Sequence, residues 1–145
     1  MSYRNLLGAI LIASAIFTGC SEPPRGGPRF KTFPVTGEVD VDGEPAELIE
    51  IECHPDGDSS EIKYPISTMT DKNGHFSIST YQSGDGLPAG DYVLSFKWIE
   101  PGLVPKDRFK GAYSDPKKSK IKVTVETGQK NDLGVIELST KGPGK

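Results

Sequence analysis

The stretch that decides the fold is Val35-Thr36-Gly37-Glu38-Val39-Asp40-Val41-Asp42-Gly43-Glu44-Pro45. Apolar or small residues alternate with polar residues from position 35 to position 41, which is the pattern of a β-strand with one buried face. Asp-Gly followed closely by proline is typical of a tight turn, because glycine adopts positive φ angles without steric cost. The stretch therefore predicts a strand, a tight turn and the start of a second strand.

The segments that follow repeat this alternation. Further strands are expected in the 49–53, 62–70, 76–80, 92–98, 121–125 and 135–138 regions. Asp71-Lys72-Asn73-Gly74 joins two of them, and Asn-Gly between alternating segments predicts a β-hairpin. The period-two pattern indicates that the largest buried faces are formed by Ile49, Ile51, Cys53, Tyr92, Leu94, Phe96 and Trp98.

These segments predict an all-β fold. No helical periodicity is found after the N-terminal segment, and seven short strands with regular turns favour one seven-stranded antiparallel β-sandwich over residues 34–139. Tyr92 follows Gly90-Asp91 at a loop-to-strand junction, which predicts a tyrosine corner, where the phenol bonds to upstream backbone. Residues 140–145 are polar and predict a disordered tail.

The N-terminal residues resemble the signal segment of a bacterial lipoprotein. Arg4 precedes an apolar stretch at residues 6–17, which is shorter than the roughly 20 residues that a membrane-spanning helix needs. The stretch ends in Phe17-Thr18-Gly19-Cys20, which resembles a lipobox. The resemblance implies that residues 1–19 are a signal peptide and that Cys20 is lipidated.

The residues after Cys20 predict a flexible tether. Residues 20–33 are rich in proline and glycine and carry little apolar surface, so they are not expected to pack into a core. At about 3.3 Å per residue the tether reaches roughly 40 Å. The lipobox implies export to the cell envelope, and Ser21 in place of an aspartate favours the outer over the inner membrane.

Several motifs together are similar to the carboxypeptidase-regulatory-like, transthyretin-like β-sandwich. They are Val35-Thr36-Gly37-Glu38-Val39, Asp42-Gly43-Glu44-Pro45, Thr70-Asp71-Lys72-Asn73-Gly74-His75-Phe76 and Pro88-Ala89-Gly90-Asp91-Tyr92. Residues 107–116 look like the corresponding run in small bacterial lipoproteins that carry this domain. The resemblance implies a fold and an envelope location, and it implies no activity.

The sequence does not predict an enzyme. Cys53 and His54 are neighbours, so in a strand they point to opposite faces and do not form a thiolate pair. The hydroxyisourate hydrolases, which are related to transthyretin, end in a Tyr-Arg-Gly-Ser motif, whereas this chain ends in Lys141-Gly142-Pro143-Gly144-Lys145. We expect no catalytic residue and no cofactor, and a hydrolase is the less favoured alternative.

The charges are segregated along the chain, although the net charge is only -3. Residues 36–62 contain ten acidic residues and no lysine or arginine, which fits solvated strand faces and leaves a calcium site open. Residues 97–122 contain eight basic residues, which fits a lysine-guarded edge strand or a contact with anionic lipid or polysaccharide. No specific metal ligand and no nucleic-acid partner are predicted.

The most consistent function is a non-catalytic, lipid-anchored interaction or structural module of the cell envelope. Its expected partners are the membrane, through lipidated Cys20, and an unidentified envelope protein or polysaccharide. Residues 82–90 and 99–119 form the long loops in which a partner contact is expected. The alternative is a carbohydrate-binding module that stacks sugars on Trp98, Tyr81 and Tyr113.

Overall fold

The computed structural model describes residues 29–143, whose regular structure consists of β-strands. This part of the chain contains no helix that could cross a membrane. The strands are β1 (Thr32–Phe33), β2 (Val35–Val41), β3 (Glu44–Pro45), β4 (Ile49–Pro55), β5 (Ile66–Met69), β6 (His75–Ser77), β7 (Leu87–Pro88), β8 (Gly90–Glu100), β9 (Lys106–Asp107), β10 (Lys122–Val125) and β11 (Asn131–Leu138).

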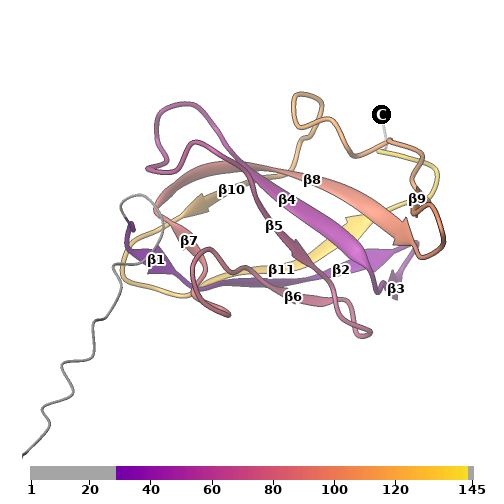
Figure 1. Cartoon of the computed structure of the whole chain (residues 1–145), viewed down its shortest axis with the longest axis horizontal. Helices are drawn as coiled ribbons and strands as arrows, with labels where there is room; N and C mark the ends of the chain where they lie inside the picture. Colours follow the sequence, from indigo (N-terminus) through magenta and orange to yellow (C-terminus); the bar gives the residue numbers. More distant parts are fainter. Residues whose placement is uncertain (1–28, 144–145) are drawn as a thin grey trace, which may run out of the picture.

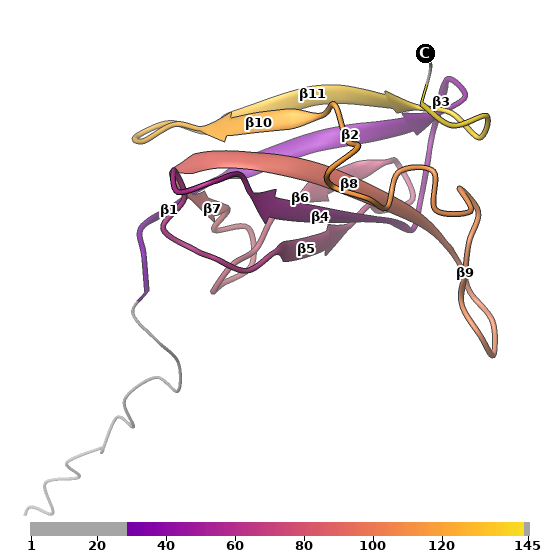
Figure 2. The ribbon, with the colours of Figure 1, turned by 90° about the horizontal axis from the view of Figure 1, so that it is seen from above.

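The strands form two sheets that pack face to face (Figures 1 and 2). One sheet has the order β10-β8-β4-β5, with β9 paired to the far end of β8. The other has the order β11-β2-β3, with β6 also paired to β2. The small β1–β7 pair lies beside the start of β8. The predicted β-sandwich is confirmed, and the seven strands of three or more residues match the seven that were expected.

One strand pair departs from the expected antiparallel arrangement. β11 runs parallel to β2, from Asn131 opposite Val35 to Leu138 opposite Val41, with an irregularity between Asp132 and Val135. A tight hairpin cannot join two parallel strands. β2 and β11 are instead separated by most of the chain, and β11 is reached from β10, which belongs to the other sheet. The sandwich is therefore mixed, with its first long strand beside its last.

The opening stretch forms the predicted strand, turn and short second strand. Asp42 and Gly43 have φ angles of 53° and 86°, as the two central residues of a type I′ turn require. The Asp42 carboxylate accepts hydrogen bonds from Ser139 Oγ (2.7 Å) and from Thr140 Oγ1 (2.6 Å) and N (3.2 Å). The Asp42 turn is therefore hydrogen-bonded to the residues that follow β11. Thr140, which was predicted to belong to a disordered tail, is one of them.

The prediction that the Asn73-Gly74 turn joins two paired strands of a hairpin is wrong. The turn itself is tight, because Asp71 Oδ1 accepts hydrogen bonds from the backbone N–H groups of Asn73 (2.8 Å) and His75 (3.1 Å). However, β5 pairs with β4 and β6 pairs with β2, so the turn carries the chain from one sheet to the other. The expected strand over residues 62–70 is correspondingly reduced to β5.

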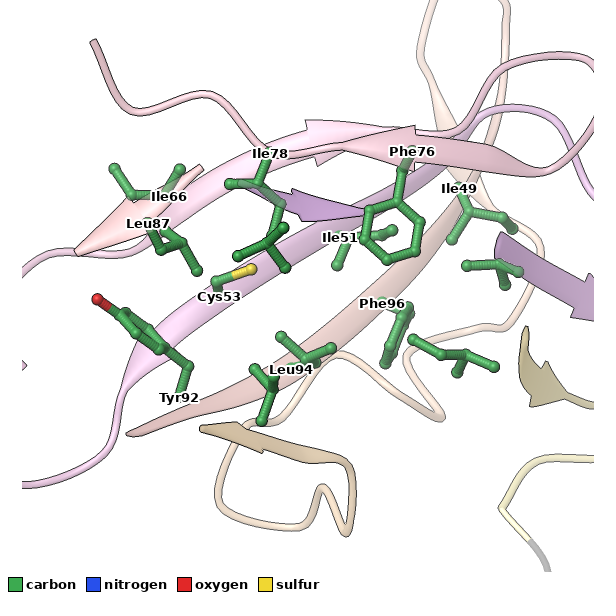
Figure 3. Packing of buried hydrophobic residues seen from close by; sticks show 14 of the residues in the cluster. Ile49, Ile51, Cys53, Ile66, Phe76, Ile78, Leu87, Tyr92, Leu94 and Phe96 are labelled. Atoms are coloured by element: carbon green, nitrogen blue, oxygen red, sulfur yellow. The ribbon is translucent and has the colours of Figure 1, made fainter. Parts of the chain in front are cut away.

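The core lies between the two sheets and is made mainly of the alternating residues. Figure 3 shows side chains from β4, β5, β6 and β8 meeting there. Trp98 is the exception among the expected core residues, since it is only half-buried at the far end of β8. The remaining predicted residues, Ile49, Ile51, Cys53, Tyr92, Leu94 and Phe96, are all fully buried.

Tyr92 forms the predicted tyrosine corner. Its hydroxyl donates a hydrogen bond to the Pro88 carbonyl oxygen (2.9 Å) and accepts one from Ser60 Oγ (2.8 Å). The bond to Pro88 fixes the path from β7 into β8, and the bond to Ser60 holds the loop after β4 against the same end of the sandwich.

The chain enters the fold slightly earlier than expected. Thr32 and Phe33 pair with Pro88 and Leu87, and the Phe33 side chain is buried. These two residues belong to the predicted tether, and burial of the aromatic ring accounts for their place in the sandwich. The predicted signal peptide and Cys20 lie outside the described residues.

Replacing Tyr92 with phenylalanine should destabilise the protein by about 1–3 kcal/mol, because the buried Ser60 hydroxyl and Pro88 carbonyl lose their partner. Urea denaturation of the purified protein measures this change. Tyr64→Phe is the control, since the Tyr64 side chain is 53% exposed and should tolerate the change. Equal stability of the two variants would contradict the tyrosine corner.

The Asp42 contacts should depend on pH. Hydrogen bonds from the Thr140 and Ser139 side chains lower the pKa of the Asp42 carboxyl below its usual 3.8. A lowered folded-state pKa stabilises the fold above pH 3.8, and this contribution is lost as the pH falls through the lower value. An NMR titration should show the Thr140 amide and the Asp42 carboxyl carbon moving together below pH 3.8. Titration of Asp42 above 3.8 would refute this.

Candidate functional site

Among the described residues, the most exposed large apolar side chains lie on the hairpin that joins β8 to β9. Ile99 pairs with Asp107 and Glu100 with Lys106, and the five residues between the strands form the tip. Leu103 is 107% exposed and Val104 is 75% exposed. Figure 2 shows this hairpin extending beyond the two sheets. Sequence reasoning placed a contact loop in this region but missed the apolar tip, whose signal is a Gly-Leu-Val run between Pro101 and Pro105.

Asp107 holds the base of the hairpin rigidly. Its Oδ1 accepts hydrogen bonds from the backbone N–H groups of Trp98 (2.9 Å) and Phe109 (2.9 Å), and its Oδ2 accepts one from Gly111 (2.8 Å). One carboxylate thus connects the end of β8 to the turn that follows β9. The tip is therefore presented on a fixed base.

An aromatic cluster supports this base. The Phe109 ring is buried, with its centroid 5.6 Å from that of Trp98 and 4.9 Å from that of Tyr113. The Arg108 guanidinium carbon lies 3.5 Å from the centroid of the Trp98 ring. Tyr113 Oη donates to the Ser139 carbonyl (3.2 Å) and accepts from the Ser139 N–H (3.0 Å). The rings of Trp98 and Tyr113 are therefore already engaged within the protein.

Tyr81, the third ring expected to stack on sugars, lies elsewhere. Its hydroxyl accepts a hydrogen bond from the Phe30 N–H (3.2 Å), and the Arg29 guanidinium lies 5.6 Å from its ring centroid. This contact belongs to the end of the sandwich where β1 enters, whereas Trp98 lies near the other end of β8. The three rings do not form one stacking surface.

A shallow depression runs along the base of the hairpin beside Trp98. Its lining comes from the turn before β4 and from the end of β8, and consists of Pro45, Ala46, Glu47, Leu48, Trp98, Ile99, Glu100, Pro101 and Arg108. Trp98 Nε1 donates to the Glu47 carbonyl oxygen (3.1 Å) across it. A second depression at this end is lined by the hairpin itself, from Glu100 to Val104 and Lys106.

Cys53 and His54 point to opposite sides of β4, as expected. Cys53 is fully buried, and burial raises the pKa of its thiol to about 12. His54 Nε2 lies 2.8 Å from Ser95 Oγ and 3.4 Å from Glu52 Oε2. Both contacts use the same ring nitrogen, whereas a Ser-His-acid relay uses two different nitrogens.

The reactivity of these residues is limited by burial. Ser95 is 2% exposed, so its hydroxyl is not available to a substrate. Neither Cys53 nor His54 lines any of the four principal depressions found in residues 29–143. The Ser95–His54 hydrogen bond therefore joins β8 to β4, with the serine hydroxyl buried and the imidazole partly exposed.

The acidic and basic parts of the chain meet across the strands. Lys97 Nζ lies 3.4 Å from Glu50 Oε2 and 3.5 Å from Glu52 Oε1. Partial burial lowers the pKa of Lys97, but the attraction of Glu52 and Glu50 outweighs it, so the pKa is raised overall. Lys97 thus offsets part of the negative charge of Glu50 and Glu52 on β4. Within the part of the chain that the structure describes, no group of three metal-ligating side chains comes together.

The expected lysine-guarded edge strand is found only in part, because β10 begins at Lys122 and the other three lysines of the cluster precede it. β10 is the outermost strand of its sheet, and Lys122 Nζ lies 2.7 Å from Asp56 Oδ2. A hydrogen bond and charge from Asp56 raise the pKa of Lys122. Charged side chains on an edge strand oppose pairing with other chains.

Comparisons with known proteins reveal resemblance only in structure. No family model and no curated protein matches the chain. A DUF3823 family protein from Parabacteroides merdae is 18% identical with a TM-score of 0.43, covering 77% of this chain and 46% of that one. The 5-hydroxyisourate hydrolase of Klebsiella pneumoniae is 18% identical with a TM-score of 0.42, covering 72% and 90%. The major pilin subunit of Bacillus cereus is 14% identical with a TM-score of 0.46, covering 74% and 30%.

Cys53 should be unreactive in the folded protein. Its burial and raised pKa leave almost no thiolate at pH 8. We expect iodoacetamide to modify Cys53 only after unfolding in guanidinium chloride, with mass spectrometry as the readout. Met69→Cys supplies the positive control, because Met69 is exposed. Rapid modification of Cys53 in the native protein would show an accessible, activated thiol and would revive the enzyme alternative.

Proposed function

We propose that this protein is a non-catalytic, lipid-anchored interaction module of the cell envelope. The observation that carries the proposal is Phe17-Thr18-Gly19-Cys20 at the end of a short apolar segment. Signal cleavage before Cys20 would leave a lipidated N-terminus, a Pro- and Gly-rich tether and the sandwich. Two or more acyl chains would hold the protein firmly, since one chain alone binds a membrane only marginally.

The arrangement of the sandwich supports this role. The described chain enters at β1, beside the start of β8, whereas the β8–β9 hairpin lies at the opposite end. β8 has 11 residues and spans about 35 Å at roughly 3.3 Å per residue. The tether at one end therefore leaves the exposed hairpin at the other end free to make a second contact.

The side chains support a non-catalytic role. The Cys53 thiol is buried in the core, and the His54 imidazole is hydrogen-bonded to a buried hydroxyl.

The residue after Cys20 favours the outer membrane. Position 21 is a serine and not the aspartate that favours inner-membrane retention in the lipoproteins that the N-terminus resembles.

The second candidate is carbohydrate binding, favoured by the depression beside Trp98. One face of the Trp98 ring is covered by the Arg108 guanidinium, so a sugar would have to bind along the ring edge or displace Arg108. A glycan array probed with the wild-type protein and with Trp98→Ala tests this candidate. Binding that persists in Trp98→Ala would exclude this depression as the sugar site.

Lipidation of Cys20 is the decisive test of the proposed function. The mature protein, isolated from membranes, should begin at residue 20 and carry acyl chains in its mass spectrum. Cys20→Ala should remove the acyl chains and prevent cleavage before position 20, whereas Cys53→Ala should leave lipidation unchanged. A mature chain that begins elsewhere, or an unmodified Cys20, would refute the anchor.

A further inference from the structure

The tip of the β8–β9 hairpin is a protruding apolar ridge, with a shallow depression along one side of it. Leu103 and Val104 are adjacent, and each exposes most of its side chain. A protein partner would need a matching groove for such a ridge, whereas a lipid bilayer accepts a protruding apolar tip without a preformed site. Figure 2 shows that the tip stands clear of the sheets, so the sandwich does not block its approach to a flat surface.

The backbone of the tip is suited to the edge of a bilayer. Polar backbone groups that enter lipid without a partner are costly. Pro101 and Pro105 have no N–H donor, so the five-residue tip carries fewer donors that need water. The base is already fixed by Asp107, so insertion would order little additional chain.

The charges around the tip favour an anionic surface. Lys106, Arg108 and Lys110 are exposed on the segment that follows the tip. The nearby carboxylates are Asp107, which is occupied by three backbone N–H groups, and Glu100 and Glu47, which line the depression beside Arg108. Lys106 and Lys110 follow the tip without adding to that depression, and cations near a membrane surface are attracted by anionic lipid.

Trp98 and Arg108 lie at the base of the hairpin, next to the strand pairs that carry the tip. Tryptophan is enriched at the level of lipid headgroups, where its ring meets both apolar and polar surroundings. The Arg108 guanidinium stacked on this ring would lie at the same level, beside the lipid phosphates. The order from the tip inward is thus aliphatic, then cationic and aromatic, as in interfacial membrane contacts.

We propose that the β8–β9 hairpin inserts Leu103 and Val104 into the surface of an anionic lipid bilayer, with Lys106, Arg108 and Lys110 at the headgroups. Together with the anchor it would give the sandwich two contacts with one membrane. The roughly 40 Å reach of the tether is comparable to the length of β8, so both ends can meet the same surface. This orientation rests on the proposed lipid anchor, whereas the affinity of the tip for anionic lipid does not.

A fluorescent probe at the tip tests the proposal in the full mature protein. Val104→Cys is labelled with an environment-sensitive maleimide dye, and the buried Cys53 stays unlabelled. The protein is reconstituted into phosphatidylglycerol-containing vesicles or into vesicles of phosphatidylcholine alone. Val135→Cys is the matched control, because Val135 is also an exposed aliphatic residue but lies on β11 of the other sheet.

We expect the Val104 probe to shift to shorter wavelength and to be quenched by brominated lipid in the anionic vesicles, with no change at Val135. The Val104→Cys protein that also carries Lys106→Glu and Lys110→Glu keeps the apolar tip. Its tip should bind the anionic vesicles about tenfold or more weakly. High salt should weaken it as well, because it screens exposed charges.

The mass of the labelled protein separates failure of the insertion from failure of the anchor. Water-like emission at Val104 in a chain with acylated Cys20 overturns the insertion and leaves the anchor. If Cys20 is not acylated, the proposed function fails. Val104→Cys is then labelled in a chain that also carries Cys20→Ser, and adding vesicles to this unanchored protein still tests the tip. Equal emission shifts of the probes at Val104 and Val135 also overturn the insertion. So does a shift at Val104 that depends on protein concentration in the absence of vesicles, because it would show that the tip binds a second copy of the chain.

Discussion

Burial of one face of β8 between the two sheets is the interaction on which the rest of the structure depends. β8 pairs with β4 over seven residue pairs and with β10 over four, and its inward side chains fill the centre of the core. Burying a large apolar side chain contributes about 1.5–3 kcal/mol, so Tyr92, Leu94 and Phe96 together outweigh any exposed ion pair in the molecule. The same strand begins at the tyrosine corner and ends at the exposed hairpin.

The outer face of this sheet shows how the segregated charges are used. Carboxylates alternate with core residues along β4, and because β8 is its antiparallel neighbour, Lys97 lies directly opposite Glu50. Such exposed pairs contribute at most about 1 kcal/mol each. One lysine between two carboxylates offsets part of the repulsion between Glu50 and Glu52, so charges that are segregated along the sequence form ion pairs in the folded sheet.

The sequence predicts those features that depend on neighbouring residues and does not predict those that depend on distant ones. Alternation correctly identified the inward residues of β4 and β8, and Asp42-Gly43 correctly identified a turn. The Asn73-Gly74 turn was also correct locally, but which sheet each flanking strand joins is decided by tertiary packing. The parallel pairing of β2 with β11 has no local signature, because it depends on where the chain crosses after β10.

The candidate site was predicted only in outline for the same reason. Residues 99–119 were expected to contain a contact loop, yet Leu103 and Val104 look like core residues in the sequence, since an apolar pair gives no sign of its own exposure. Their exposure has a tertiary cause. β8 and β9 pair at only two positions, Ile99–Asp107 and Glu100–Lys106, and the tip extends past them. Trp98 was expected to be either core or ligand platform, and it instead supports the base of the hairpin through Phe109 and Arg108.

The two ends of β8 differ in a way that bears on function. At its start, Tyr92, Pro88 and β1 tie the incoming chain into buried structure. At its far end, Asp107 satisfies three backbone donors with one side chain and leaves an apolar tip in water, which folding alone does not require. Exposing two adjacent aliphatic side chains on a rigid base is unfavourable for an isolated protein, and that cost is the physical reason to look for the function at this end.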